Sequence, residues 1–207
     1  MNLVKEIFRI IHEYFKKHLL KSTVVCASLF IFAWVLSYFI VRALPTETSA
    51  GIFQYISENM VSSDVVLESG KLSFIGLFLH NLRAGATMLC CGLVPFLFLP
   101  LLLVAFNGGI LGTVMGLADG AAGESVFFMF VKYILPHGIF EIPSLVICGA
   151  IGIKLCAFLC RKILGKAKGE RFRYHWVRCI AIFVVIVVPL VLVAAFIEAV
   201  ILGAVYL

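Results

Sequence analysis

Charged residues are scarce in this sequence, in which Asp, Glu, Lys and Arg make up 14% of the 207 residues, against about 25% in soluble domains. Hydrophobic residues take their place at 63%, and the mean hydropathy is +1.13. This composition excludes an ordinary soluble domain and a disordered chain. The apolar residues form continuous runs without the two-residue alternation of a membrane β-barrel. We therefore expect an all-α integral membrane protein, because a helix satisfies its own backbone groups in lipid.

The sequence also lacks the patterns of several catalytic sites. No His-Glu-x-x-His pair is present to supply two zinc ligands from one helix, so a zinc site would have to assemble His80, His137 and Glu141. An intramembrane aspartate is missing as well, because Asp64 and Asp119 are expected in loops. We predict no enzymatic activity, no catalytic residues, no resident metal and no cofactor.

The seven cysteines are an odd number and lack the spacing of a secreted disulfide framework, so no disulfides are expected. Cys156 and Cys160 share a helix face near the end of the fourth apolar run. We interpret them as small packing residues, with palmitoylation or metal binding as the alternative.

Five apolar runs are long enough to cross a bilayer, which takes about 20 helical residues. They lie at about Thr23–Val41, Leu72–Leu93 and Phe96–Leu117, within Phe127–Leu159, and at Ile180–Tyr206. The fourth run is too long for one straight crossing and too short for two, so we expect it to be broken. The chain 1–207 is thus predicted to be a single transmembrane domain, a polytopic helical bundle of about five spans.

Basic residues cluster in residues 1–21 and in the basic loop 160–178 between the fourth and fifth spans. Because Lys and Arg favour cytoplasmic flanks, we predict a multi-pass plasma-membrane protein with a cytoplasmic N-terminus and an extracytoplasmic C-terminus. The connection 42–71, which carries acidic residues, is then an extracytoplasmic loop. We interpret the net charge of +6 as an insertion signal and an attraction to anionic lipid, and we expect no binding of nucleic acid.

Residues 1–21 are predicted to form a cytoplasmic interfacial helix. Apolar residues recur there at helical spacing between charged ones, at Leu3, Ile7, Phe8, Ile11, Phe15 and Leu19. The charges exclude the uninterrupted core of a cleavable signal. Such a helix can lie in the headgroup plane, and packing against the underside of the bundle is an equal alternative.

Two prolines divide the fourth apolar run. Pro136 suits a first helical turn, where its missing N–H costs nothing. Pro143 is internal, so it removes the bond to the carbonyl of Ile139 and is expected to kink the helix. We predict a short re-entrant or interfacial helix over about Phe127–Leu135, followed by the membrane-crossing part of the fourth span.

A set of polar residues lies inside segments that are otherwise apolar: His80, Asn81, Arg83, Asn107, His137 and Glu141. A charge at membrane depth costs at least a few kcal/mol, so such residues usually face one another or a wet cavity. We expect Glu141 to pair with Arg83 or His80, and Asn81, Asn107 and His137 to complete the hydrogen bonds. The cluster is either a structural knot or a working site. Glu198 in the last span either joins the cluster or approaches the outer interface.

Glycines recur every four residues in the third span, at Gly108, Gly112 and Gly116. A ridge of this kind lets another backbone approach closely and holds helices together in lipid. We assign Gly152 in the fourth span to the same packing role. The ridge meets either another span of the same chain or a second copy, which leaves a homo-oligomer open.

The region Leu72–Leu164 resembles the stage II sporulation protein M family of bacterial and archaeal membrane proteins. The residues that carry the resemblance are Asn81 to Gly85, Asn107-Gly108 with Gly112, and Pro136-His137-Gly138 with Glu141, Pro143 and Gly152. In spore-forming bacteria the family's namesake belongs to a septal complex with two peptidoglycan-degrading enzymes and is needed for engulfment of the forespore. Related proteins occur in organisms that do not sporulate, so the resemblance implies the architecture more strongly than this role.

The resemblance implies a non-enzymatic membrane scaffold that positions extracytoplasmic peptidoglycan hydrolases as partners. The connection 42–71 is the expected contact surface, since it is long enough for a short surface helix but not for an enzyme domain. The kinked fourth span supports a second function, a transporter or channel for a small ion, a proton or a lipid. A solvent-connected cavity that reaches Glu141 would favour transport.

Overall fold

The computed structural model describes residues 2–59, 73–121, 125–167 and 169–205. Within these ranges all regular secondary structure is helical. Five helical stretches are long and apolar enough to cross a membrane: Lys5–Ala43, Phe74–Cys91, Leu99–Asp119, Val126–Ile163 and Phe172–Val200. Each contains or overlaps one of the predicted apolar runs. The prediction of an all-α bundle with five spans is therefore confirmed.

Three of the five stretches consist of several consecutive helical segments. The elements are α1 (Asn2–Tyr14), η1 (Phe15–Leu19), α2 (Leu20–Ala43), α3 (Thr46–Asn59), α4 (Phe74–Cys91), α5 (Leu99–Ala121), α6 (Val126–Met129), η2 (Phe130–Ile134), α7 (Leu135–Ile163), α8 (Phe172–Ile182), η3 (Phe183–Val187) and α9 (Val188–Val205). The segments η1, η2 and η3 are single π-helical stretches. Such stretches distort a helix locally and often occur at functional sites.

Local sequence signals explain several helix ends. Leu44, which follows α2, is extended, with φ −78° and ψ 151°, because the residue before a proline is disfavoured in the helical region. The Ser73 hydroxyl caps α4 by accepting a hydrogen bond of 3.0 Å from the Gly76 N–H. Pro100 lies in the first turn of α5, where it costs no hydrogen bond.

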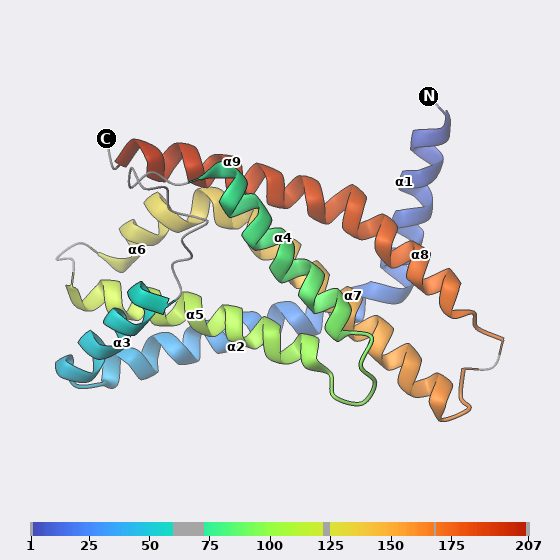
Figure 1. Cartoon of the computed structure of the whole chain (residues 1–207), viewed down its shortest axis with the longest axis horizontal. Coiled ribbons are helices and arrows are strands. Elements are labelled where there is room, and N and C mark those ends of the chain that lie inside the picture. The colour runs from blue at the N-terminus through green and yellow to red at the C-terminus, as the bar shows by residue number, and fades with distance from the viewer. Residues whose placement is uncertain (1, 60–72, 122–124, 168, 206–207) are drawn as a thin grey trace.

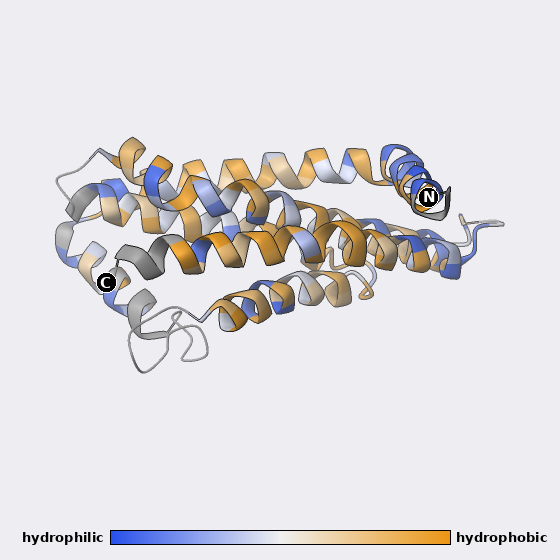
Figure 2. Cartoon of the chain, turned by 90° about the horizontal axis from the view of Figure 1, so that it is seen from above, coloured by the Kyte–Doolittle hydropathy of each residue, from blue (hydrophilic) through white to orange (hydrophobic). Residues whose placement is uncertain are grey.

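The fourth span lies at the centre of the bundle. In its most apolar window 56% of the residues are buried, against 17–28% in the other spans. Its helix α7 packs against α2, α4, α5 and α9, and α2 packs along α5 on one side of the bundle (Figure 1). Apolar residues cover the length of the long helices, and hydrophilic residues gather toward their ends (Figure 2). This pattern is that of a bundle whose outer surface faces lipid.

The N-terminal helix α1 leaves the bundle at a steep angle to α2 (Figure 1). Its Ile11 and Tyr14 are buried and pack in one core cluster with Cys179 and Ile182. Ile7 and Phe8 are exposed. Of the two alternatives for residues 1–21, the structure therefore supports packing against the bundle for the second half of α1, while the first half keeps an apolar surface that suits the interface.

The two segments predicted as loops both contain helix. The connection 42–71 contains α3 over Thr46–Asn59, and residues 60–71 lie outside the described residues. In the basic segment 160–178, α7 continues to Ile163 and α8 begins at Phe172. Basic side chains are favourable in the last turn of a helix because they complement its dipole, which explains why Arg161 and Lys162 continue α7.

Cysteine thiols hold the turn between α4 and α5. The Cys156 thiol donates to the Val94 carbonyl at 3.3 Å, and the Phe96 N–H donates to Cys160 Sγ at 3.0 Å. Phe96 adopts a φ of +68°, a conformation uncommon for a bulky residue, and the two thiols support it. All seven cysteines are free in the structure, and Cys156 and Cys160 are buried in the bundle.

Candidate functional site

Three ionisable side chains meet between the fourth and fifth spans. His137 and Glu141 lie one turn apart on α7, so both project from the same face, and Glu198 comes from α9, which packs against α7. His137 Nε2 is 3.9 Å from Glu141 Oε2. One ligand atom from each of the three residues lies within 4.8 Å of the others. The structure therefore assigns Glu198 to the polar cluster.

The electrostatics of this cluster are unfavourable without a compensating charge. Two ionised carboxylates within 4.8 Å of each other would repel by at least about 3 kcal/mol at an effective dielectric constant of 20. The distance of 3.9 Å between His137 Nε2 and Glu141 is too long for a hydrogen bond. His137 Nδ1 is buried and has no hydrogen-bond partner among the described residues. A cation or a proton bound between the three groups would reduce the repulsion between the two carboxylates.

The other residues of the predicted cluster lie on α4 and α5. On α4, His80 and Arg83 are exposed and Asn81 is half-buried. Asn107 Nδ2 donates to the Leu103 carbonyl one turn back in α5 at 2.7 Å, so this donor is used within its own helix. Glu141 lies within ion-pair distance of His137, and its pairing with Arg83 or His80 stays a prediction.

The fourth span is one continuous helical stretch, Val126–Ile163, and the kink expected at Pro143 stays a prediction. The chain changes direction between α6 and α7 (Figure 1), where η2 provides a π-helical stretch. Pro136 occupies the first turn of α7, as predicted, and α7 continues through Pro143. Next to Pro143, the Ser144 hydroxyl donates to the Glu141 carbonyl at 2.7 Å.

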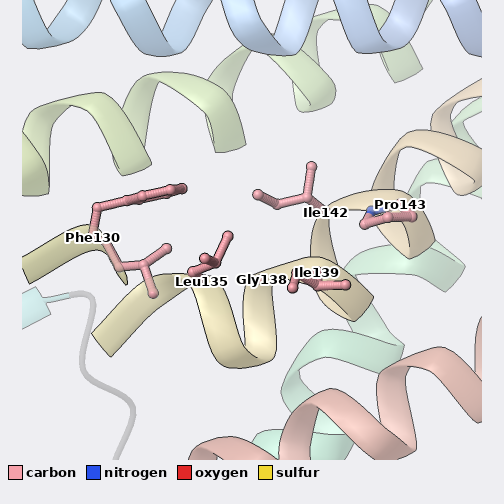
Figure 3. Close-up of a pocket in the computed structure, with 7 residues that line it drawn as sticks. Phe130, Leu135, Gly138, Ile139, Ile142 and Pro143 are labelled. Carbon is pink, nitrogen blue, oxygen red and sulfur yellow. The ribbon is translucent and has the colours of Figure 1, made fainter. Parts of the chain in front are cut away.

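An apolar pocket of about 240 Å³ lies along this bend (Figure 3). Its lining residues are Phe130, Ile134, Leu135, Gly138, Ile139, Ile142 and Pro143. At 100° per residue, Gly138 and Ile142 project from α7 about 100° around the helix from His137 and Glu141, and none of the three clustered residues lines the pocket. The pocket is therefore separate from the polar cluster.

The glycine ridge of α5 faces α2 of the same chain. A Cβ atom on Gly112 would contact the Trp34 carbonyl oxygen and would lie 3.0 Å from the Tyr38 nitrogen. A Cβ on Gly108 would contact the Phe30 carbonyl oxygen, and one on Gly116 would lie 3.0 Å from the Tyr38 carbonyl oxygen. Backbone thus meets backbone along α2 and α5, which is the contact that small residues permit in membranes.

Gly152 plays a similar part between α7 and α4. A Cβ on Gly152 would lie 2.5 Å from the Met88 carbonyl oxygen and 2.6 Å from Pro100 Cγ.

At the C-terminal end of α5, an ion pair joins this helix to α2. Arg42 Nε lies 2.9 Å from Asp119 Oδ2, and the Tyr38 hydroxyl donates to the same oxygen at 2.9 Å. The expectation that Asp119 lies in a loop was wrong, because α5 continues to Ala121. An arginine and a tyrosine on the neighbouring helix offset the cost of placing the carboxylate there.

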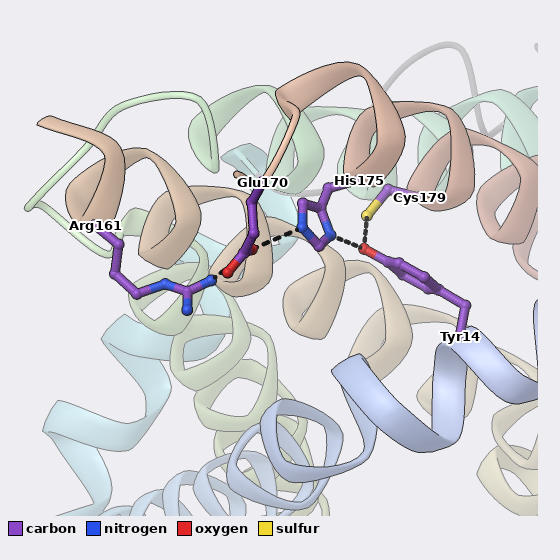
Figure 4. Close-up of polar contacts among 5 residues, drawn as sticks. All are labelled: Tyr14, Arg161, Glu170, His175 and Cys179. Carbon is purple, nitrogen blue, oxygen red and sulfur yellow. Dashed lines mark hydrogen bonds and ion pairs between the residues drawn. The ribbon is translucent and has the colours of Figure 1, made fainter. Parts of the chain in front are cut away.

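A second polar network joins α1, α7 and α8 at the other end of the bundle (Figure 4). His175 is buried. Its Nε2 lies 3.0 Å from Glu170 Oε2, and its Nδ1 lies 2.8 Å from the Tyr14 hydroxyl oxygen. Arg161 contacts the same Glu170 oxygen at 3.2 Å. Because a carboxylate only accepts, a neutral His175 donates from Nε2 and accepts the Tyr14 proton at Nδ1. This network fixes α1 against the bundle.

Sequence reasoning left Glu198 without a role and missed the Tyr14–His175 contact. Glu198 is a charge inside an apolar run, which is itself a signal of function or pairing. The spacing along the chain cannot show that it meets Glu141, 57 residues earlier. Tyr14 and His175 are 161 residues apart and carry no signal at the local level.

The family model described as stage II sporulation protein M matches residues 26–201, most of the chain. No curated protein and no solved structure matches the sequence. The match includes four of the five candidate spans completely, the first span from residue 26 onward, and each of the three clustered residues.

Proposed function

The chain belongs to the stage II sporulation protein M family, and from this premise we propose that it is a non-enzymatic membrane scaffold. In this proposal it positions peptidoglycan-degrading partners on the extracytoplasmic side of the plasma membrane, as in the engulfment of a forespore. The chain is a multi-pass membrane protein with five candidate spans. To the family and the membrane class, the proposal adds the identity of the partners and the orientation of the chain in the membrane.

The charge distribution supports the orientation. Residues 2–21 and the connection between α7 and α8 lie at one end of the bundle, and both are rich in Lys and Arg. The helix α3 lies at the opposite end (Figure 1). Because basic flanks stay in the cytoplasm, α3 faces outward in this proposal.

The observation that carries the scaffold proposal is the helix α3 beside the outer ends of α2 and α5. It follows α2 after only Leu44 and Pro45 and contacts α5. Its Tyr55 is 65% exposed, and large aromatic side chains of this kind are enriched at protein interfaces. The Arg42–Asp119 ion pair joins the two helices next to it. A partner can therefore dock on α3 and be held in a fixed position relative to the membrane.

Deletion of residues 51–60 tests this function. The full chain and the deletion variant are purified from membranes of the native host after mild crosslinking, and peptidoglycan-degrading activity in the eluates is measured on peptidoglycan-containing gels. We expect the deletion to abolish this activity, and Tyr55→Asp to reduce it at least tenfold. Lys166→Asp, at the opposite end of the bundle, is the control and should leave recovery unchanged. Undiminished recovery with the deletion variant contradicts the proposed contact surface.

Transport remains the second candidate because of the His137–Glu141–Glu198 cluster. The pocket of Figure 3 does not provide a path for a polar solute, since it is apolar and lies on another face of α7. Flux through proteoliposomes that Glu141→Gln eliminates, with the fold retained, would favour transport over the scaffold.

A further inference from the structure

We propose that His137, Glu141 and Glu198 bind one divalent transition-metal ion, such as Zn²⁺ or Mn²⁺, which joins the fourth and fifth spans. This inference is independent of the scaffold proposal, because it concerns the inside of the bundle and its test measures metal. The sequence alone predicts no metal, and a zinc site would have needed His80 beside His137 and Glu141. The tertiary structure places Glu198 there instead.

The distances fit a site that closes around an ion. A tetrahedral ion with ligand bonds of 2.0–2.2 Å holds its ligand atoms about 3.3 Å apart. In the structure His137 Nε2 lies 3.9 Å from Glu141 Oε2, and the three ligand atoms lie within 4.8 Å of one another. A closure of at most about 1.5 Å is within the range of rotations about the several χ angles of a glutamate.

The ligand types select the class of ion. One imidazole nitrogen and two carboxylate oxygens suit zinc, manganese and iron, whereas calcium and magnesium prefer sites made of oxygen alone. The two carboxylates supply the negative charge that a divalent cation balances. Three protein ligands leave one position open, as in many zinc sites that bind water.

The unsatisfied imidazole is an independent indication of a ligand. The His137 side chain is only 13% exposed, and its Nδ1 is buried with no partner among the described residues. Its Nε2 is beyond hydrogen-bond distance from Glu141. Buried polar atoms almost always have a partner. A metal on Nε2 would give this ring one partner, where the described side chains provide none within hydrogen-bond distance.

The site has a structural consequence. His137 and Glu141 follow the bend at η2 by one or two turns, and Glu198 lies near the end of the last described helix. The fourth span changes direction just before α7 (Figure 1). A bound ion would therefore fix the start of α7 to the C-terminal part of α9. The metal would act as a crosslink between the two spans.

Metal binding to the full chain in detergent tests this proposal. The protein is purified with a tag that contains no histidine, stripped with a chelator and titrated with Mn²⁺ or Zn²⁺ by calorimetry, with metal content measured by mass spectrometry. We expect one ion per chain. Glu198→Gln should weaken binding at least tenfold, because even residues that only support metal ligands contribute 10–100-fold. The matched control Glu47→Gln, an exposed glutamate on α3, should bind like the wild type.

Two further measurements keep the test decisive. X-ray absorption of the zinc-loaded wild type should show nitrogen and oxygen ligands, and sulfur ligands would assign the ion to a cysteine and overturn the proposal. If Glu198→Gln loses its helical circular dichroism, Glu141→Gln and His137→Asn take its place. Equal binding by wild type and a folded ligand variant, or no binding by wild type, also overturns it.

Discussion

Replacing Gly112 tests the close packing of α2 and α5 most directly. A Cβ at this position would contact the Trp34 carbonyl oxygen and lie 2.9 Å from the Trp34 carbonyl carbon. These neighbours are backbone atoms of α2, so they cannot rotate away as a flexible side chain can. Relief requires the two helices to separate by at least about 0.5 Å, and such a gap forfeits about a quarter of the dispersion energy of each contact it opens.

The expected cost of Gly112→Ala follows from this geometry. Adding one methyl group to a tightly packed site costs about 1–3 kcal/mol. At about 2–4 °C per kcal/mol for a protein of this size, the melting temperature should fall by about 2–12 °C. Gly112→Leu adds three more carbons at the same contact and should disrupt assembly of the bundle, with loss of yield and of a single peak in size-exclusion chromatography.

Thermal unfolding in detergent, followed with a thiol-reactive dye, measures this effect, because buried cysteines such as Cys26 and Cys148 become reactive only on unfolding. Gly138→Ala is the matched control inside a span. Its Cβ would lie 3.6 Å from Ile134 and Ile142, an ordinary contact, so its melting temperature should equal or exceed that of the wild type. If Gly112→Ala melts no lower than this control, the close approach of α2 and α5 is refuted.

Two more predictions concern the polar contacts at the bundle ends. Asp119→Ala should lower the free energy of unfolding by about 1 kcal/mol, because the carboxylate binds Arg42 and Tyr38 but the arginine is partly exposed. A melting temperature equal to that of wild type would show that these contacts contribute nothing. For Glu170, partial desolvation raises the pKa, but the hydrogen bond with His175 and the charge of Arg161 outweigh it and lower the pKa from 4.5. Glu170 should therefore stabilise the protein at neutral pH and lose this contribution as the pH falls below 4.5. The difference in melting temperature between wild type and Glu170→Gln should shrink over that range, and a constant difference would contradict the assignment.

The membrane class and the number of spans could be predicted because both depend on local composition. A continuous apolar run of about 20 residues has few alternatives to a membrane helix, and all five predicted runs correspond to candidate spans. The proline in the first turn of α7 was predictable for the same reason, since Pro136 acts on its own backbone. Pro143 was harder to judge, because neighbouring groups can satisfy the turn and let α7 continue.

The composition of the candidate site could be predicted only in part. His137 and Glu141 are four residues apart, so the helical repeat alone places them on one face. The third member depends on how α9 is rotated about its axis and how far it is shifted along α7. Packing decides both, and the same packing leaves His80 and Arg83 exposed on α4 and places Asp119 against Arg42.

The sequence by itself determined that this is a helical membrane protein with five candidate spans, and that its few intramembrane polar residues needed partners. It could do so because hydrophobicity and the helical repeat act over neighbouring residues. Only the tertiary structure decided which partners they have: Glu198 beside Glu141, α2 against the glycines of α5, and Tyr14 on His175. These contacts join residues far apart in the chain, and the rotation and depth of each helix, which set them, result from the packing of the whole bundle.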